Sequence, residues 1–224
     1  MDELNPPRPI RLAVVDDDPL VRTGLALLLA AFPDIEIVAE AGDGAGLDRL
    51  VDAHWPDVVL MDLRMPKVDG LVATERLRSR PSPPSVIVLT TFNADGEVLR
   101  ALRAGASGFL LKDAAPRDIV DAIRLVAAGE AMLSPPVIRQ LIDHVADGTA
   151  RTRRGEARER LATLSARERA VAMALGQGRS NARIAADLGM SVPTVKGHVS
   201  RLLAKLGLDN RVQVALLVHD ARLD

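Results

Sequence analysis

Short apolar runs alternate with longer segments of helical spacing through the first half of the chain. The runs are bounded by Pro, Gly and Asp, and they cover Ile10–Val15, Ile35–Ala39, Val58–Met61, Val86–Leu89 and Gly108–Leu111. Continuous apolar runs of this length predict buried parallel strands. In the first intervening segment, Asp18 is placed to cap a helix and Pro19 suits its first turn. Five strand–helix repeats in about 120 residues predict an open α/β sheet.

From Leu161 onward the pattern is wholly helical. Ser165 and Glu168 have the spacing of a capping box, which predicts a helix to Leu175, ended by glycines. A short helix over 181–188 leads to a tight turn at Gly189-Met190, after which Ser191 caps a longer helix. A helix, a tight glycine turn and a second helix are typical of a DNA-binding helix-turn-helix unit.

The second helix of this unit has two distinct faces. Its apolar face consists of Val195, Val199, Leu202, Leu203 and Leu206, and its other face of Lys196, Gly197, Ser200 and Arg201. With helical periodicity, the first face packs inward and the second can enter a DNA groove. A further helix from Asn210 to His219 has the apolar residues to close the small bundle or to pair with a second copy.

The segment between the two halves has a different character. Ser134-Pro135-Pro136 opens an expected short helix to about Asp147, and the following DGTARTRRGEARER is charged and poor in apolar residues. That composition is typical of a flexible tether. We therefore expect a first domain over 8–128, a linker with a short helix over 129–160, and a helical domain over 161–222.

Composition narrows the function classes. The 224 residues include no cysteine, which excludes disulfides, cysteine-liganded zinc and thiol nucleophiles. The first ten residues lack the layout of a secretory signal, and the longest apolar run falls well short of the ~20 residues that span a membrane. We therefore expect a soluble cytoplasmic protein without a membrane partner.

The net charge of −1 hides an asymmetry between the halves. Residues 1–128 contain 14 Lys+Arg against 20 Asp+Glu, a net −6, whereas residues 129–224 contain 15 against 10, a net +5. Such an asymmetry indicates two domains with different partners, the basic one suited to a polyanion.

Polar residues stand where the predicted strands end. Asp16 and Asp17 follow the first strand, Asp62 the third, Thr90 ends the fourth, and Lys112 follows the fifth. In an open α/β sheet, ligands bind beyond the carboxyl ends of the strands, so these groups are expected to converge. Clustered carboxylates need a cation, and all-oxygen ligands favour Mg²⁺. With the charge neutralised, one carboxylate can attack phosphorus while the hydroxyl and ammonium groups bind the phosphoryl oxygens.

The first half resembles a known family over residues 8–128. The stretches that carry the likeness are VVDDDP, DVVLMDLRMPKVDG, VIVLTT and GFLLKD, which are similar to those of the receiver domain of bacterial two-component response regulators. The resemblance implies a flavodoxin-like fold with five parallel strands and Asp62 as the phosphoacceptor. It also implies that Mg²⁺ is bound at Asp16, Asp17, Asp62 and the backbone carbonyl of Arg64. By the same resemblance Thr90 and Lys112 contact the phosphoryl group, and Thr90 and Phe109 are the switch residues.

The second half resembles the LuxR-type helix-turn-helix domain over residues 161–219. The segment TVKGHVSRLLAKL is the most specific part of the likeness. The resemblance implies base or phosphate contacts by Lys196, Gly197 and Ser200. It implies DNA-backbone contacts by Arg183, Thr194, Arg201 and Lys205.

Together the two resemblances imply a DNA-binding response regulator of the NarL/FixJ type, and not an enzyme. A sensor histidine kinase is expected to phosphorylate Asp62 in the presence of Mg²⁺, which favours homodimerisation and binding to double-stranded promoter operator DNA. Two alternatives stay open. One is an aspartate-nucleophile phosphatase, although the second acid that such enzymes need two residues after the nucleophile is replaced here by Arg64. The other is a regulator whose receiver is structural and never phosphorylated.

Overall fold

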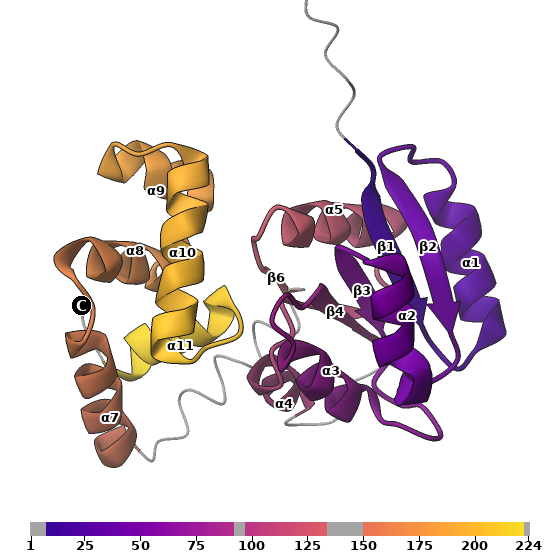
Figure 1. Cartoon of the computed structure of the whole chain (residues 1–224), viewed down its shortest axis with the longest axis horizontal. Coiled ribbons are helices and arrows are strands. Elements are labelled where there is room, and N and C mark those ends of the chain that lie inside the picture. The colour runs from indigo at the N-terminus through magenta and orange to yellow at the C-terminus, as the bar shows by residue number, and fades with distance from the viewer. Residues whose placement is uncertain (1–7, 92–96, 134–149, 222–224) are drawn as a thin grey trace, which may run out of the picture.

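A computed structural model describes residues 8–91, 97–133 and 150–221, which form two units (Figure 1). The strands of the first unit are β1 (Ile10–Val15), β2 (Ile35–Ala41), β3 (Val58–Met61), β4 (Ser85–Thr90), β5 (Gly108–Leu111) and β6 (Met132–Leu133). Its helices are α1 (Pro19–Leu29), α2 (Leu47–His54), α3 (Gly70–Arg78), α4 (Glu97–Arg103) and α5 (Pro116–Ala127), with a 3-10 turn, η1 (Gly44–Gly46).

The strands form one parallel sheet in the order β2-β1-β3-β4-β5-β6. The five strands expected from the sequence are all present. The expected number was nevertheless wrong, because β6 adds a sixth strand, pairing Met132 and Leu133 with Gly108 and Phe109. Two residues are too short to produce a recognisable apolar run. The strand order reverses between β1 and β3, which places the topological switch point of the sheet beside those two strands.

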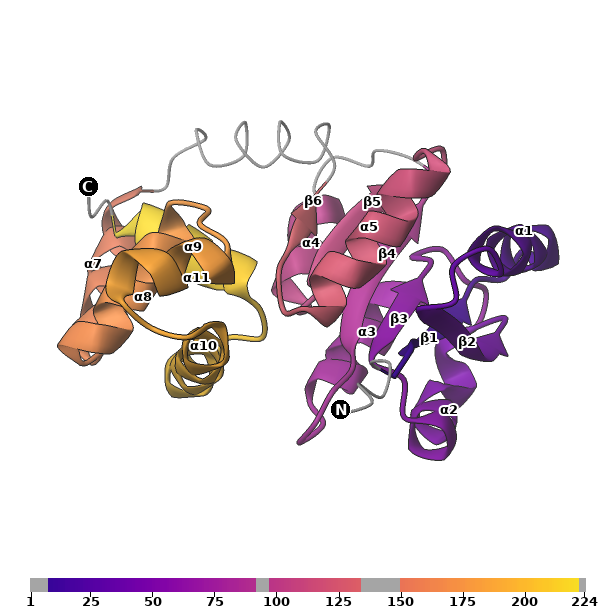
Figure 2. The same ribbon diagram turned by 90° about the horizontal axis from the view of Figure 1, so that it is seen from above.

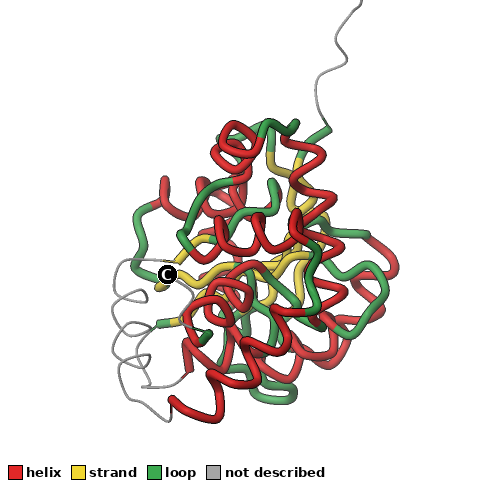
Figure 3. The backbone as a smooth tube through the Cα atoms, turned by 90° about the vertical axis from the view of Figure 1, so that its left-hand side faces the viewer, coloured by secondary structure: helices red, strands yellow, loops and turns green. Residues whose placement is uncertain are grey.

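Helices cover both faces of the sheet (Figure 3). On one face, Leu25 and Leu29 of α1 and Ile123 of α5 pack in one cluster with Leu12 and Leu60. On the other face, α2 and α3 pack in a second cluster and α4 in a third. Strands buried on both faces explain why the sequence shows continuous rather than alternating apolar runs.

Local sequence sets the start of the first helix. Asp18 accepts a hydrogen bond from the backbone N–H of Leu20 at 2.8 Å, and Pro19 occupies the first turn of α1. Asp18 is therefore the N-cap of α1, as the sequence predicted.

The second unit is all-helical. Its helices are α7 (Ala150–Ala162), α8 (Ala166–Gly176), α9 (Asn181–Leu188), α10 (Val192–Leu206) and α11 (Arg211–Asp220). Ser165 and Glu168 form the predicted capping box at the start of α8. Gly189 ends α9 in the left-handed conformation, and Ser191 caps α10. The helix-turn-helix connection expected from the sequence is present.

The expectation of a flexible tether up to residue 160 was wrong from residue 150 onward. That part of the segment forms α7, and Ala157 and Leu161 on its one apolar face are buried in the core of the helical unit. The helix is therefore part of the bundle although most of its residues are polar. The short helix expected to end at about Asp147 lies outside the described residues. Within the described ranges, no helix has the length and apolar character needed to span a membrane.

The two units contact each other through α4 and α11 (Figure 2). Val212 of α11 is buried in the same cluster as Leu102 of α4 and Phe109 of β5. Other residues of α11, among them Val214 and Val218, pack into the helical bundle. The last helix therefore closes its own bundle with one face and docks on the first unit with another.

Candidate functional site

Three carboxylates meet at the switch point of the sheet. Asp16 follows β1 and Asp62 follows the neighbouring strand β3, and both are buried, whereas Asp17 is exposed. A carboxylate oxygen from each of Asp16, Asp17 and Asp62 lies within 4.8 Å of the other two. The expected convergence of these three side chains is present, and the Asp18 side chain caps α1.

Lys112 lies against two of these carboxylates. Its Nζ is 2.6 Å from Oδ2 of Asp16 and 3.0 Å from Oδ2 of Asp62. The backbone N–H of Lys112 donates to the carbonyl of Thr90 at 2.7 Å, so the ends of β4 and β5 are held together. Thr90 is buried at the end of β4. The residues predicted to form the site therefore lie at the same edge of the sheet.

A glycine shapes the loop behind the central carboxylate. The N–H of Gly70 donates to the carbonyl of Leu63 at 2.9 Å, and a Cβ on Gly70 would collide with the backbone oxygen of Asp62. Only glycine allows this close approach. Gly70 therefore lets the loop after β3 fold tightly under the Asp62 carboxylate.

Burial and the neighbouring charges shift the pKa values of Asp62 and Lys112 in opposite directions. Burial raises the pKa of Asp62, while its hydrogen bonds with Lys112 and with the backbone N–H of Arg64 partly offset this. Burial lowers the pKa of Lys112, but the hydrogen bonds to Asp16 and Asp62 outweigh burial, so the net shift is upward. A carboxylate destabilised by burial gains from any further cation placed beside it.

The cluster has the chemistry of a magnesium site. Its three side chains supply only oxygen donors, and Asp17 remains open to solvent, as entry and exchange of an ion require. Asp16, Asp17 and Asp62 are the side chains that can hold such an ion. The Asp cluster therefore fits that ion.

Phe109 of β5 packs in one cluster with Leu63, next to Asp62, and with residues of α4. It is buried in the same cluster as Leu63, Leu102 and Ala106. On the surface, the guanidinium of Arg64 is paired with Glu97 at the start of α4, with 3.5 Å between Nη2 and Oε1. Both contacts connect the neighbourhood of Asp62 to α4.

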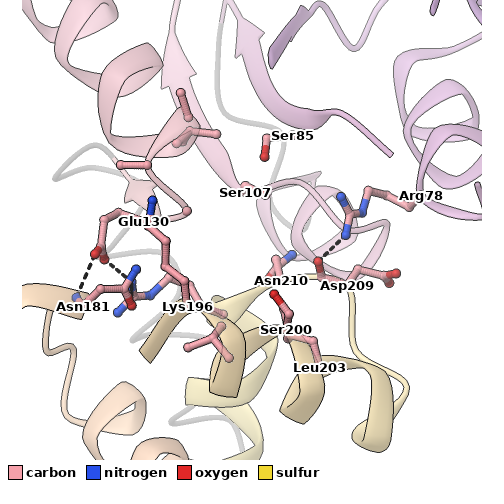
Figure 4. A pocket seen from close by; sticks show the side chains of 16 residues that line it. Arg78, Ser85, Ser107, Glu130, Asn181, Lys196, Ser200, Leu203, Asp209 and Asn210 are labelled. Carbon is pink, nitrogen blue, oxygen red and sulfur yellow. Dashed lines mark hydrogen bonds and ion pairs between the residues drawn. The ribbon is translucent and has the colours of Figure 1, made fainter. Parts of the chain in front are cut away.

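The candidate DNA-contacting residues fall into two groups. Lys196 and Ser200 on α10 line a cavity between the two units, opposite Ser85 and Ser107 of the first unit (Figure 4). Two of the four residues of the polar face of α10 therefore lie beside the first unit. A Cβ on Gly197 would meet no atom within 4 Å, so nothing in the protein requires glycine there.

The other candidates are engaged within the helical unit. The hydroxyl of Thr194 lies 2.7 Å from that of Ser191, which caps α10. The remaining pairs are Arg183 with Asp187 at 3.1 Å, Lys205 with Glu168 at 2.9 Å, and Arg201 with His198 at 3.3 Å. Each of these four side chains thus has a partner within the helical unit.

Sequence reasoning missed the polar residues at the junction of the units. Asn210 donates to the carbonyls of Leu102 and Ala106 at 3.2 and 2.8 Å, and Gln213 donates to that of Leu102 at 2.8 Å. Arg78 of α3 donates to the carbonyl of Asp209. The only local signal was the capping role of Asn210, because the partners of these side chains lie about a hundred residues earlier in the chain.

A second junction contact involves Glu130. It accepts from the backbone N–H of Asn181 at 2.8 Å and forms an ion pair with Arg211. Nothing in the sequence around Glu130 distinguishes it from other surface carboxylates.

Two family models match the chain. The response regulator receiver domain matches residues 12–124, and the luxR family of bacterial regulatory proteins matches residues 162–218. The two matches fall on the α/β unit and on the helical unit.

Similar proteins cover nearly the whole chain. The nitrate/nitrite response regulator NarL of Escherichia coli K12 is 35% identical over 96% of this chain and 97% of its own length. The transcriptional regulatory protein LiaR of Bacillus subtilis is 37% identical over 94% of this chain and 97% of its own. Among solved structures, the response regulator ChrA of a heme-sensing two-component system is 36% identical, with a TM-score of 0.53 over 96% of this chain and 99% of that one.

Proposed function

The chain belongs to the response regulators that carry a LuxR-type DNA-binding domain, and from this premise we propose that phosphorylation of Asp62 by a sensor histidine kinase controls its binding to promoter DNA. The observation that carries the proposal is the arrangement at the switch point, where the buried Asp62 carboxylate lies between Lys112 and the acidic pair Asp16 and Asp17. The family consists of transcription regulators, and we propose no catalytic turnover for this member.

The transfer uses groups at the edge of the sheet. An oxygen of Asp62 attacks the phosphorus of the kinase's phosphohistidine, and the P–N bond breaks as the O–P bond forms, so that the imidazole leaves. The ammonium group of Lys112 and the hydroxyl of Thr90 bind the oxygens of the arriving phosphoryl group. Asp16, Asp17, Asp62 and the backbone carbonyl of Arg64 would hold a Mg²⁺ ion, which would supply positive charge between the carboxylates and the phosphoryl group.

The signal then passes to α4. When Thr90 turns toward the phosphoryl group, the space it leaves beside β4 is available to Phe109, which packs against Leu102 of α4. A shift of α4 alters its contacts with α11, because the carbonyl of Leu102 accepts from both Asn210 and Gln213. The phosphoryl group thus biases an equilibrium between docked and released DNA-binding domains.

The docked arrangement competes with DNA. Lys196 and Ser200 of α10 line the cavity beside the first unit, so a duplex that approaches this side of α10 meets the first unit as long as the two units are docked. We propose that release also frees α11 for homodimerisation, and that the dimer binds paired operator half-sites in the cytoplasm.

The proposal is tested by labelling the protein with radioactive acetyl phosphate in the presence and absence of Mg²⁺. The wild type is expected to acquire Mg²⁺-dependent label, and Asp62→Asn is expected to acquire none. Asp18→Asn is the matched control, because it removes a neighbouring carboxylate while asparagine caps helices as well as aspartate does. Label that persists in Asp62→Asn, or that disappears equally in Asp18→Asn, contradicts the assignment.

A further inference from the structure

One carboxylate of the receiver is bound by two groups of the DNA-binding domain. Oε1 of Glu130 accepts from the backbone N–H of Asn181 at 2.8 Å (Figure 4). Oε2 of Glu130 is paired with the guanidinium of Arg211. The side chains of Glu130 and Arg211 are only 16% and 11% exposed. This is therefore a largely desolvated ion pair and not a solvated surface contact.

The receiver holds this carboxylate in a fixed position. Gly129 follows the end of α5 with a φ of 82°, a left-handed conformation that glycine adopts without strain. The N–H of Glu130 donates back to the carbonyl of Leu125 at 2.9 Å. This glycine turn directs the chain off the end of α5, and Glu130 is the first residue beyond it.

The DNA-binding domain builds the opposite half of the contact without help from the receiver. Nη2 of Arg211 donates to the carbonyl of Arg179 at 2.5 Å, and Nη1 lies 3.5 Å from Oδ1 of Asn181. The guanidinium is thus oriented by the loop before α9. Burial lowers the pKa of Arg211, and the charge of Glu130 opposes that shift. An anion at this position stabilises the charged form of the buried guanidinium.

These two donors have the chemistry of an oxyanion site. Asn181 is the first residue of α9, where backbone N–H groups are free of partners within the helix and the helix dipole favours negative charge. A helix N-terminus combined with a guanidinium is a common way to bind phosphate. A carboxylate already occupies the site, so its preference for an anion is visible in the structure.

The site lies beside the polar face of the recognition helix. Asn181, Glu130 and Arg211 line the same cavity as Lys196 and Ser200 of α10. Contacts to DNA phosphates commonly flank a recognition helix in its groove and fix its register. We propose that the N–H of Asn181 and the guanidinium of Arg211 form a binding site for a DNA backbone phosphate, and that Glu130 occupies it in the docked form as a surrogate for that phosphate.

The inference rests on the proposed DNA-binding function and adds one site to it. The receiver and DNA cannot occupy this site together. Docking and DNA binding therefore compete directly for this site, in addition to the obstruction of DNA by the docked receiver. Arg211 takes part in both states, and its loss must therefore open the docked form and weaken DNA binding at once. A residue that only latched the two units together would show the first effect alone.

The test compares the full-length variants Glu130→Gln and Glu130→Gln/Arg211→Gln. Because a phosphate site is independent of sequence, the probe is a fluorescein-labelled DNA duplex of mixed sequence, titrated by anisotropy at several salt concentrations. Glu130→Gln is expected to raise the affinity of the unphosphorylated chain by about tenfold, because it leaves Arg211 unpaired in the docked form. Asp121→Asn, which removes an exposed receiver carboxylate, is the matched control and is expected to change little.

Adding Arg211→Gln to Glu130→Gln is expected to lower the affinity by about tenfold and to reduce the slope of log K against log salt by about 0.9, the value for one lost phosphate contact. Arg211→Lys on the same background is expected to restore most of the slope, because it keeps the charge. Arg158→Gln on α7 is the matched control, since it also removes a guanidinium that donates to a backbone carbonyl, that of Ala221.

The outcomes separate the inference from the proposed function. If Glu130→Gln binds no more tightly than Asp121→Asn, Glu130 is not a surrogate and the inference fails. If the double variant matches Glu130→Gln in affinity and slope, or loses affinity at an unchanged slope, Arg211 contacts no phosphate and the inference also fails. If no variant binds the duplex, with or without phosphorylation, it is the proposed DNA-binding function that fails.

Discussion

Asn210→Asp is expected to release the DNA-binding domain from the receiver while leaving its own fold intact. The side chain of Asn210 has two separate roles. Its Oδ1 accepts from the N–H of Gln213 at 2.9 Å and caps α11, and its Nδ2 donates to the carbonyls of Leu102 and Ala106. Aspartate caps as well as asparagine does, but it places an anionic oxygen where the amide donor stood.

The size of the effect follows from these two contacts. A net hydrogen bond contributes about 0.5–1.5 kcal/mol, and a carboxylate oxygen that faces two carbonyls adds repulsion, so we expect a loss of about 2–3 kcal/mol. This corresponds to a roughly 30- to 160-fold shift of the docking equilibrium toward the released form. The affinity of the unphosphorylated chain for DNA should rise by up to the same factor, until the docked form no longer predominates.

Two readouts together test the reasoning. The chain contains no cysteine, so cysteines introduced at the exposed positions Val72 and Ala186 accept a fluorophore pair without background labelling. Asn210→Asp should lower energy transfer between the units, and the thermal unfolding of the helical unit should change little. The reasoning is refuted if energy transfer and DNA affinity both stay at wild-type values while unfolding shows the cap preserved.

Three further variants test separate parts of the account. Leu161→Ala should lower the free energy of unfolding of the helical unit by about 2–5 kcal/mol in denaturant titrations, because Leu161 is 1% exposed in the core of that unit. A loss no larger than that of the control Glu156→Ala would show that α7 is not part of the bundle. Hydrogen bonds from the backbone and hydroxyl of Ser165 and from Lys205 lower the pKa of Glu168 from 4.5 to about 2. Because this pKa is lowered in the folded state, the ionised Glu168 carboxylate stabilises the fold above pH 4.5, and this stabilisation is lost as the pH falls toward 2. Glu168→Gln should therefore flatten the pH dependence of Tm between these two pH values. An unchanged profile would refute the capping argument. Lys196→Ala should weaken DNA binding and reduce the salt slope by about 0.9, and unchanged binding would show that the recognition face is misplaced.

Features encoded by neighbouring residues could be predicted from the sequence. The buried strands follow from continuous apolar runs, and the capping box at Ser165 needs only residues three positions apart. The candidate phosphorylation site was equally accessible. Topology alone brings the carboxyl ends of parallel strands to one edge, so Asp16, Asp62 and Lys112 had to be neighbours.

Features that depend on distant partners could not be predicted. The helix α7 has few apolar residues, and it is stabilised by a bundle that the local sequence does not describe. Glu130 and Asn210 are ordinary polar residues until the two units dock, when each meets groups 51 or more positions away in the chain. One expected DNA contact, Arg183, was found in a local ion pair with Asp187, because opposite charges four residues apart on a helix face lie close together.

The central claim is that a phosphoryl group on Asp62 controls DNA binding, and one comparison tests it most directly. The affinity of the full-length wild type and of Asp62→Asn for the same promoter duplex is measured before and after treatment with acetyl phosphate and Mg²⁺, at constant salt. We predict that treatment raises the affinity of the wild type and leaves that of Asp62→Asn unchanged. An equal gain in both proteins, or no gain in a wild type shown to be phosphorylated, would contradict the claim.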